Sequence, residues 1–273
     1  MVSPISYFKP EGEDDMNVAE MLEVRDGVTQ NLLYEGKAKR IYETNDPNVY
    51  RMVFKDDITA GDGEKKDTLL NKGKLNQTIS KKIFEHLHSK QIGRDGSTMK
   101  THYLSSPSVN EQLVKNLHII PVEVIVRNFA AGSFCRRYGI EKGLKFSTPL
   151  LELFYKNDDL HDPLCSEAVA IEMGWCDPSQ LRLIKEQAHI LNFQMLHFWA
   201  KYGLTLVDQK FEFGMDKEGN LMLADEITPD SQRLWDKNGK SLDKDVFRQG
   251  DNMQDVSDVY NYVHKLIGAD PID

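Results

Sequence analysis

The sequence lacks long apolar segments and is poor in cysteine. None of its hydrophobic runs approaches the roughly 18 residues that a membrane-spanning helix needs, so we expect no membrane partner. The first residues, MVSPISYFKPEGEDDMN, lack the basic and apolar regions of a signal peptide. The three cysteines, Cys135, Cys165 and Cys176, do not have the spacing of a metal site. We therefore expect reduced thiols and a cytoplasmic protein.

An excess of positive charge is also missing. The formal net charge of -9 argues against nonspecific nucleic-acid binding. It does not exclude small anionic substrates, because basic side chains can still cluster locally. The length of 273 residues and the hydrophobic fraction of 40% fit one large globular domain or two ordinary ones.

The richest candidate site is a predicted hairpin whose first strand is LTLVDQKFEF. Side chains of a strand alternate between its two faces, so Asp208, Lys210 and Glu212 share one face and the two phenylalanines lie on the other. The segment 214–220 carries Gly, Asp and Asn and predicts a turn. The returning LMLAD would then place Asp225 roughly opposite Lys210 and one diagonal step from Glu212.

This hairpin predicts a small volume that holds two carboxylates and a lysine. Such a group suits a magnesium ion that is shared with phosphate oxygens. The alternative is a surface ladder of salt bridges, because paired charges across strands are common. Asp230 and Arg233 lie just beyond the hairpin in a Pro-containing loop and favour the ligand site.

Basic residues follow a glycine near the start of the expected fold. LLYEGKAKRIYET and VYRMVF are predicted strands, separated by a turn at Asn45–Asn48. Gly36 would let the backbone approach a phosphate, and Lys37 and Lys39 would neutralise it. The chain has no Walker A spacing, so a solvated basic strand end is the alternative.

A second candidate anion site follows the most strand-like run, Val122–Val126. That run delivers Arg127 into a segment of small residues that ends at Ser133. A charged strand end is again the alternative. Helices are expected over about 68–90 and 255–267, and another begins with Asp177 as its N-cap and Pro178 at its first position.

Five motifs occur in the same order as in the SAICAR synthetase (phosphoribosylaminoimidazole-succinocarboxamide synthase) family. They are LYEGKAKRIY, ITAGDGEKKD, VEVIVRNFAAGS, LVDQKFEFG and LADEITPDSQRLWD, and the resemblance covers about Leu32 to Val263. It implies an α/β (α+β) fold of two domains after an extension, 1–30. An antiparallel-sheet nucleotide domain related to kinase and ATP-grasp folds would span 31–120, and a larger α/β domain would span 121–273.

The resemblance also implies an activity. The family uses ATP and magnesium to join L-aspartate to the carboxylate of carboxyaminoimidazole ribonucleotide (CAIR), a step of de novo purine synthesis. Because a carboxylate is inert towards amines, an acyl phosphate intermediate is expected. The implied partners are these small molecules, and a homo-oligomer is allowed.

Residue roles follow from the matching motifs. The resemblance implies that ATP lies between the domains and that backbone between Ile119 and Glu123 meets adenine. Asp230 would orient Arg233 or a substrate. The implied cofactor contacts are Lys37, Lys39, Ile119, Glu123, Lys210, Glu212 and Asp225, with magnesium on Glu212 and Asp225. The implied substrate contacts are Asp62, Arg127, Ser133, Asp208, Asp230 and Arg233, and the catalytic residues are Lys210 and Asp208.

Two other functions are compatible with parts of this pattern. A small-molecule kinase of related fold would release a phosphoester, although the chain lacks the H-R-D and D-F-G signatures of protein kinases. A nucleotide-binding protein without activity is the second, and the retained charged motif residues argue against it. Gln209 stands where the family commonly has an aromatic residue, and its side chain is expected on the face opposite Asp208.

Overall fold

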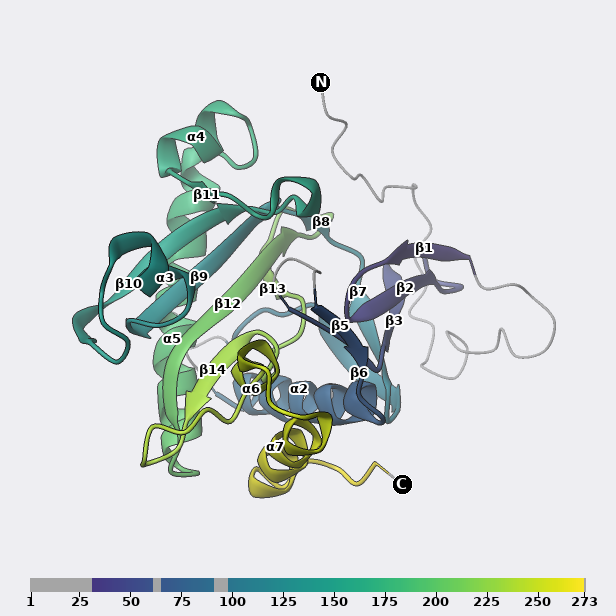
Figure 1. Ribbon diagram of the computed structural model, residues 1–273. Coiled ribbons are helices and arrows are strands. Elements are labelled where there is room, and N and C mark those ends of the chain that lie inside the picture. The colour runs from purple at the N-terminus through teal and green to yellow at the C-terminus, as the bar shows by residue number, and fades with distance from the viewer. Residues whose placement is uncertain (1–30, 61–64, 91–97, 273) are drawn as a thin grey trace.

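Two large antiparallel sheets, a two-stranded β4-β5 sheet and the helices packed on them form the described part of the molecule (Figure 1). The computed structural model describes residues 31–60, 65–90 and 98–272. The predicted mixed α/β fold is confirmed. The strands are β1 (Leu32–Glu35), β2 (Lys39–Glu43), β3 (Val49–Phe54), β4 (Asp57–Ala60), β5 (Lys65–Thr68), β6 (Tyr103–Ser108), β7 (Glu111–Lys115), β8 (His118–Ile119), β9 (Val122–Phe129), β10 (Lys145–Tyr155), β11 (Leu164–Cys165), β12 (Thr205–Met215), β13 (Leu221–Ala224) and β14 (Gln232–Trp235). The helices are α2 (Lys72–His88), α3 (Ser133–Tyr138), the 3-10 turn η1 (Asp158–Leu160), α4 (Glu167–Glu172), α5 (Pro178–Ala200), α6 (Asp245–Gln249) and α7 (Met253–Leu266).

The first sheet has five strands in the order β1-β2-β3-β7-β6. The run LLYEGKAKRIYET, expected as one strand, forms two, because it reverses at Gly36, whose N–H donates to the Lys39 carbonyl at 2.9 Å. This reversal places Lys37 at the tip of a hairpin and Lys39 at the start of β2. Lys39 can therefore extend from the first sheet towards the second.

The second sheet has the order β11-β10-β9-β12-β13, with β14 and β8 also paired to β12. Strand β12 crosses the middle of the view in Figure 1 and has four strand partners along its length. The predicted strand at Val122–Val126 is confirmed, and β9 continues to Phe129. Pairing along both edges, with one register shift between Leu206 and Asp208 opposite β14, fixes which β12 side chains share a face.

Helix boundaries follow local signals only in part. The predicted capping box at the start of α5 is confirmed, with Asp177 accepting from the Gln180 N–H and Gln180 accepting from the Asp177 N–H. The helix ends at Ala200, before the glycine expected to stop it. Helix α2 begins at Lys72, later than expected, because Thr68 belongs to β5 and pairs with β4.

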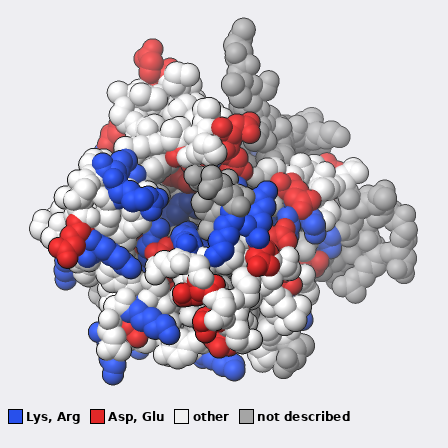
Figure 2. Space-filling view, viewed as in Figure 1, with Lys and Arg blue, Asp and Glu red and all other residues white. Residues whose placement is uncertain are grey.

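The main hydrophobic core belongs to the second sheet and the helices, with Tyr103 of β6 added to it, while β3 and β7 of the first sheet bury a smaller cluster of their own, Met52, Phe54 and Val114. Apolar side chains of α2, α5, α7 and the second sheet form a continuous buried cluster. The sheets also meet directly, because the His102 N–H donates to the Leu223 carbonyl at 2.9 Å. Lysine and arginine side chains gather around a hollow near the centre of the face in Figure 2. Within the described ranges, no helix has both the length and the apolar character to cross a bilayer.

Candidate active site

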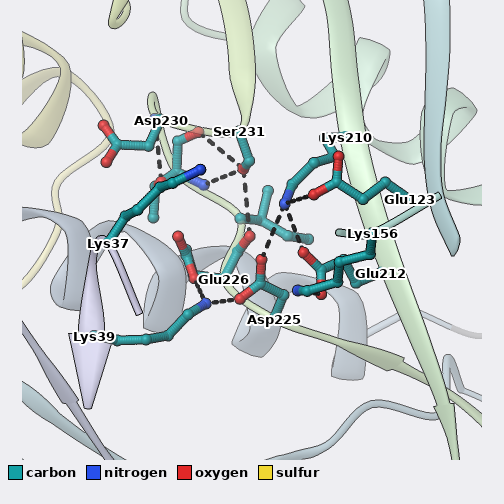
Figure 3. A network of polar contacts seen from close by, with 12 residues as sticks. Lys37, Lys39, Glu123, Lys156, Lys210, Glu212, Asp225, Glu226, Asp230 and Ser231 are labelled. Atoms are coloured by element: carbon teal, nitrogen blue, oxygen red, sulfur yellow. Dashed lines mark hydrogen bonds and ion pairs between the residues drawn. The ribbon is translucent and has the colours of Figure 1, made fainter. Parts of the chain in front are cut away.

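A cluster of lysines and carboxylates lies where the first sheet faces the open end of the β12–β13 hairpin, opposite its turn (Figure 3). Strands β2, β9 and β12 contribute to it, together with the segments that follow β10 and β13. We call it the lysine–carboxylate cluster. Its members are Lys39, Lys156, Lys210, Glu123, Glu212, Asp225 and Glu226.

The predicted meeting of Lys210, Glu212 and Asp225 is confirmed, but its predicted register is wrong. Glu212 pairs with Ala224, so regular alternation would direct Asp225 to the opposite face. Strand β13 ends at Ala224, and Asp225 adopts a left-handed φ of 63°. Asp is one of the residues that tolerate this conformation. The turn returns the Asp225 carboxylate to 3.6 Å from Lys210 Nζ.

Lys210 stands at the centre of three carboxylates. Its Nζ lies 2.8 Å from Glu123 Oε1 and 2.6 Å from Glu212 Oε1. Burial by itself would lower the pKa of Lys210, but the charges of Glu212 and Glu123 outweigh it and raise the pKa well above its usual range. The amine is therefore held as a fixed positive charge.

Glu212 is 3% exposed, so the predicted alternative of a salt-bridge ladder on the protein surface is excluded for this residue. Burial would raise the pKa of Glu212, but Lys156, Lys210 and Lys39 hold it well below its usual range. The carboxylate is thus ionised although it is buried. A buried anion with several cations around it is typical of a ligand site as well as of a structural network.

Lys39 bridges the two sheets by its ion pairs with Asp225 and Glu226. Burial lowers the pKa of Lys39, although Glu226 and Glu212 oppose that shift. Burial would raise the pKa of Glu226, and Lys39 outweighs it and lowers the pKa. The amine that the sequence assigns to phosphate thus already lies beside the carboxylates assigned to magnesium.

The donor set fits a metal ion that is shared with phosphate. The described residues contain no group of three or more His, Cys, Asp or Glu side chains arranged to hold a metal by themselves. Magnesium in nucleotide sites takes only one or two protein carboxylates and completes its shell with phosphate oxygens and water. Glu212 and Asp225, which converge on Lys210, match that requirement.

The second part of the site is centred on Asp208 of β12, which lies between Arg127 of β9 and Arg233 of β14. We call these three residues the arginine triad. Asp208 pairs across the sheet with both arginines. Its Oδ2 lies 2.7 Å from Arg127 Nη1 and 2.9 Å from Arg233 Nη1. One carboxylate therefore holds two guanidinium groups side by side.

Further carboxylates hold the outer sides of these arginines. Glu152 accepts from Arg127 Nε at 2.6 Å, and Asp245 accepts from Arg233 Nε at 2.9 Å. Burial would lower the pKa of Arg233, but Asp208 and Asp245 raise it. Ser133 accepts from Arg127 Nη2 at 3.4 Å, so the predicted grouping of Arg127, Ser133, Asp208 and Arg233 is confirmed.

The structure corrects one alternative for Asp230. Its carboxylate pairs with Lys72 at 2.6 Å and accepts from the Tyr260 hydroxyl, whereas Arg233 is oriented by Asp208 and Asp245. Burial would raise the pKa of Asp230, but Lys72 outweighs it and the pKa lies well below its usual range. Asp230 does not orient Arg233, so of its two predicted roles only substrate contact remains.

Other predicted residues lie at the edges of this region. Lys37 is half exposed at its hairpin tip, with Nζ 2.7 Å from Asp158 Oδ1. Ile119 of β8 pairs with Gly214 of β12. Glu123 contributes its side-chain carboxylate to the lysine–carboxylate cluster, whereas the resemblance implied that its backbone would contact adenine. Asp62 lies outside the described residues.

The sequence analysis missed several members of the site. The structure shows Lys72 fully buried at the start of α2. The sequence carried a signal for this, because Lys72 lies three residues before Leu75 and therefore on the apolar stripe of the helix. Glu226 follows a predicted metal ligand directly. Lys156 and Glu152 had no comparable signal, because their partners are 15 or more residues away in the chain.

Matches to known proteins agree with this geometry. The family model for SAICAR synthetase matches residues 32–266. A phosphoribosylaminoimidazole-succinocarboxamide synthase of Streptococcus pyogenes is 44% identical over 241 residues, which cover 88% of this chain and 99% of that protein. A crystal structure of phosphoribosylaminoimidazole-succinocarboxamide synthase from Ehrlichia chaffeensis is similar with a TM-score of 0.82 and 40% identity, covering 88% of this chain and all 100% of the other. A SAICAR synthetase in complex with ADP is similar with a TM-score of 0.79 and 40% identity, covering 87% of this chain and 98% of the other. The chain belongs to the SAICAR synthetase family.

Proposed function

We propose that this chain uses ATP and magnesium to join L-aspartate to the carboxylate of CAIR, giving the amide SAICAR, ADP and phosphate in de novo purine synthesis. One observation carries the proposal most directly. Strand β12 places a cluster suited to a metal–triphosphate beside a triad suited to anionic substrate groups. Membership of the family and the ADP complex of a relative support the use of ATP.

In this proposal the lysine–carboxylate cluster receives the triphosphate. Lys39 and Lys210 offset its negative charge, and Lys37 reaches it from the hairpin tip. Glu212 and Asp225 hold the magnesium ion, which when bound offsets charge that develops on the transferred phosphoryl group. The backbone between Ile119 and Glu123 receives adenine. The nucleotide domain, 31–120, and the substrate domain, 121–273, enclose the site between them.

The arginine triad receives CAIR and aspartate. Planar guanidinium groups form paired hydrogen bonds with phosphates and carboxylates, which a lysine amine cannot do. Asp208 keeps Arg127 and Arg233 at a fixed separation, so the two positive charges are preorganised for an anion. Ser133, Asp62 and Asp230 complete the substrate contacts of this proposal.

The reaction proceeds through an acyl phosphate. A carboxylate oxygen of CAIR attacks the γ-phosphorus, a C–O–P linkage forms, and ADP leaves with the electron pair of the broken P–O bond. The aspartate amine then attacks the acyl carbon and loses a proton, and phosphate leaves with the former carboxylate oxygen. Lys210 offsets charge during the first step, and Asp208 lines the pocket in the second. Positioning of the reactants supplies much of the acceleration.

An isotope experiment tests both the activity and the intermediate. The protein is incubated with ATP, magnesium, aspartate and CAIR carrying ¹⁸O in its carboxylate. We expect the amide product together with one ¹⁸O atom in the released phosphate. Amide formation without label transfer would contradict the acyl phosphate, and a stable phosphoester in place of the amide would indicate a small-molecule kinase. Rapid ATP hydrolysis in the absence of CAIR would also contradict the scheme.

Cytoplasmic localisation, the oligomeric state and the absence of nucleic-acid or membrane partners stay predictions from the sequence.

A further inference from the structure

A chain of buried amides runs behind the arginine triad, on the other face of the same sheet. We call it the amide ladder. It consists of the side-chain amides of Asn128 on β9, Gln209 on β12, Gln232 on β14 and Asn192 on α5, together with the indole N–H of Trp199 on α5. All of these side chains are at most 7% exposed. The prediction that Gln209 points away from Asp208 is confirmed by its contacts with α5.

The hydrogen bonds of the ladder run from one strand to the next. The Trp199 indole N–H donates to Gln232 Oε1 at 3.0 Å, and Gln232 Nε2 donates to Gln209 Oε1 at 2.9 Å. Gln209 Nε2 donates to Asn192 Oδ1 at 2.8 Å. Asn192 and Asn128 donate to each other at 2.9 and 3.1 Å. Three strands and one helix are thereby connected.

Every amide nitrogen and oxygen in this set has a partner. Asn128 Nδ2 also donates to the Leu206 carbonyl at 3.2 Å, and none of these atoms is among the buried polar atoms that lack a hydrogen bond. In a buried environment, a polar network that is fully satisfied adds rigidity, whereas loss of one member leaves others unpaired at a cost. The ladder therefore specifies one arrangement of the three strands.

Each strand member of the ladder is adjacent in sequence to one member of the triad. Asn128 follows Arg127, Gln209 follows Asp208, and Gln232 precedes Arg233. Adjacent residues of a strand point to opposite faces, and a register slip by one residue would exchange those faces. Gln209 and Gln232 are directly paired across the sheet, as are Asp208 and Arg233.

We propose that the amide ladder consists of positioning residues that set the spacing of Arg127, Asp208 and Arg233, and thereby the affinity for the imidazole ribonucleotide. This inference rests on the proposed function, because that function assigns CAIR to the triad. The ladder does not contact the lysine–carboxylate cluster through any hydrogen bond recorded between described residues. Nucleotide binding should therefore be insensitive to it.

Calorimetric titration of Gln209→Met with CAIR and, separately, with MgADP tests the proposal. Methionine keeps the length of the side chain and removes its hydrogen bonds. We expect the Kd for CAIR to rise by about ten- to a hundredfold, because misplacement of binding groups by about 1 Å can cost about a hundredfold. The Kd for MgADP should stay within about twofold of wild type. Asn192→Leu, which changes the ladder from the helix side, should give the same split.

Gln77→Met is the matched control. Gln77 is also fully buried, and it donates to Ser106 and to the Glu111 carbonyl in the first sheet, away from the triad. We expect this variant to lose thermal stability but to keep both affinities within about twofold of wild type. If Gln209→Met weakens both ligands equally, or leaves CAIR binding unchanged, the positioning role is wrong. If wild-type protein does not bind CAIR at all, it is the proposed function that fails.

A measurement on the unsubstituted protein does not depend on any variant folding. The side-chain amide NMR signals of Gln209 and Gln232 should shift when CAIR is added and stay in place when MgADP is added. These amides do not touch the ligand in our proposal, so a shift reports the coupling through the sheet. Signals that do not respond to CAIR would overturn the inference.

Discussion

Strand β12 contributes Lys210 and Glu212 to the lysine–carboxylate cluster and Asp208 to the arginine triad, and the ion-pair networks of the two regions have opposite excess charge. Among the described residues, the cluster combines four carboxylates with three lysine amines. The ion-pair network of the triad extends through Glu152 and Asp245 to Arg137 and Arg248, and as a whole it combines four guanidinium groups with three carboxylates. The first composition suits a divalent cation that arrives with a polyphosphate, and the second suits a free anion. In the proposed reaction, one strand thus holds the groups that bind each of the two charged reactants.

The two regions also differ in how they are held. The triad is built from facing residues of three paired strands and has the amide ladder behind it. The cluster depends on Asp225, which lies outside any strand, and on Lys39, which comes from the other sheet. We therefore expect the triad to be the more rigid region and the cluster to depend on the placement of the two sheets.

The largest expected effect comes from neutralising the carboxylates of the cluster. Glu212→Gln and Asp225→Asn keep the shape of each side chain but remove the charge that a metal ion needs. We expect each change to lower kcat by more than about a hundredfold, which corresponds to about 2.7 kcal/mol. Steady-state rates against magnesium concentration measure the effect, and excess magnesium should recover part of the loss.

Glu218→Gln is the control for this comparison. Glu218 is exposed on the turn of the same hairpin, so its substitution should leave the rate near that of wild type. Near-normal rates in both Glu212→Gln and Asp225→Asn, with melting temperatures unchanged, would show that the cluster is a structural salt-bridge network only.

Removal of an arginine should have a smaller effect, confined to the other ligand. Arg233→Ala deletes a charge-assisted contact, which is worth about 1.5 to 3 kcal/mol. We expect the KM for CAIR to rise by about ten- to a hundredfold while the KM for ATP changes by less than about twofold. Arg182→Ala, which removes an exposed charge on α5, should change neither constant. Equal losses for ATP and CAIR would remove the distinction between the two regions.

Displacing the same arginine without removing it should have a smaller effect still. A Cβ on Gly132 would lie 2.7 Å from Arg233 Cζ, and Gly132 has a positive φ of 56°. Because Asp208 and Asp245 hold Arg233 on both sides, its guanidinium cannot move without breaking an ion pair. We expect Gly132→Ala to raise the KM for CAIR by about tenfold, or about 1.4 kcal/mol.

Gly139→Ala is a control for a positive φ without the contact. Gly139 has φ 64° and ψ 29°, in the left-handed region, whereas Gly132 has φ 56° and ψ -129°, which costs alanine more, and a Cβ on Gly139 would meet nothing within 4 Å. This control should lose stability through the backbone alone and keep the KM for CAIR. If the two variants have the same KM, crowding of Arg233 is not the cause.

The same comparison explains which parts of the site could be predicted from the sequence. Alternation within LVDQKFEFG was enough to place Asp208, Lys210 and Gln209 on their faces, because side-chain direction in a strand is a local property. The position of Asp225 needed the register and a left-handed residue, which the length of the turn did not reveal. Motif matching supplied the triad, whose members come from three separate strands.

Long-range partners could not be predicted from periodicity. Lys156 and Glu212 are 56 residues apart, and Lys39 and Glu226 are 187 residues apart. Only the packing of the two sheets brings them together, and nothing in the local pattern of either segment encodes that packing. The α/β fold was predicted from the resemblance of five ordered motifs to the family, while the local patterns indicated only individual strands and helices.

The smallest expected effect concerns acid sensitivity near the cluster. Burial lowers the pKa of the His102 imidazole to about 3, and the charge of Lys39 adds to the shift against Glu226 and Glu212. In the unfolded chain a histidine takes up a proton near pH 6.5, whereas His102 in the folded protein does not. Stability is therefore lost as the pH falls below about 6.5 towards the folded pKa. Between about pH 6.5 and 5.5 this loss should amount to about 1 kcal/mol. In the triad, burial would lower the pKa of Arg233 but Asp208 and Asp245 raise it, so its guanidinium group contributes no such dependence.

His102→Gln isolates that contribution, because glutamine does not titrate. The free energy of unfolding, measured with urea at several pH values, should fall less steeply between pH 6.5 and 5.5 in the variant, by about 1 kcal/mol. The dependence of the rate on magnesium concentration should be the same for both proteins, since His102 supplies no metal ligand in the proposed site. Parallel pH profiles would mean that the imidazole is already solvated in the folded state. The acid sensitivity would then have to come from the carboxylates of the cluster, whose lowered pKa values, as for Glu212 and Glu226, also remove stability as the pH falls.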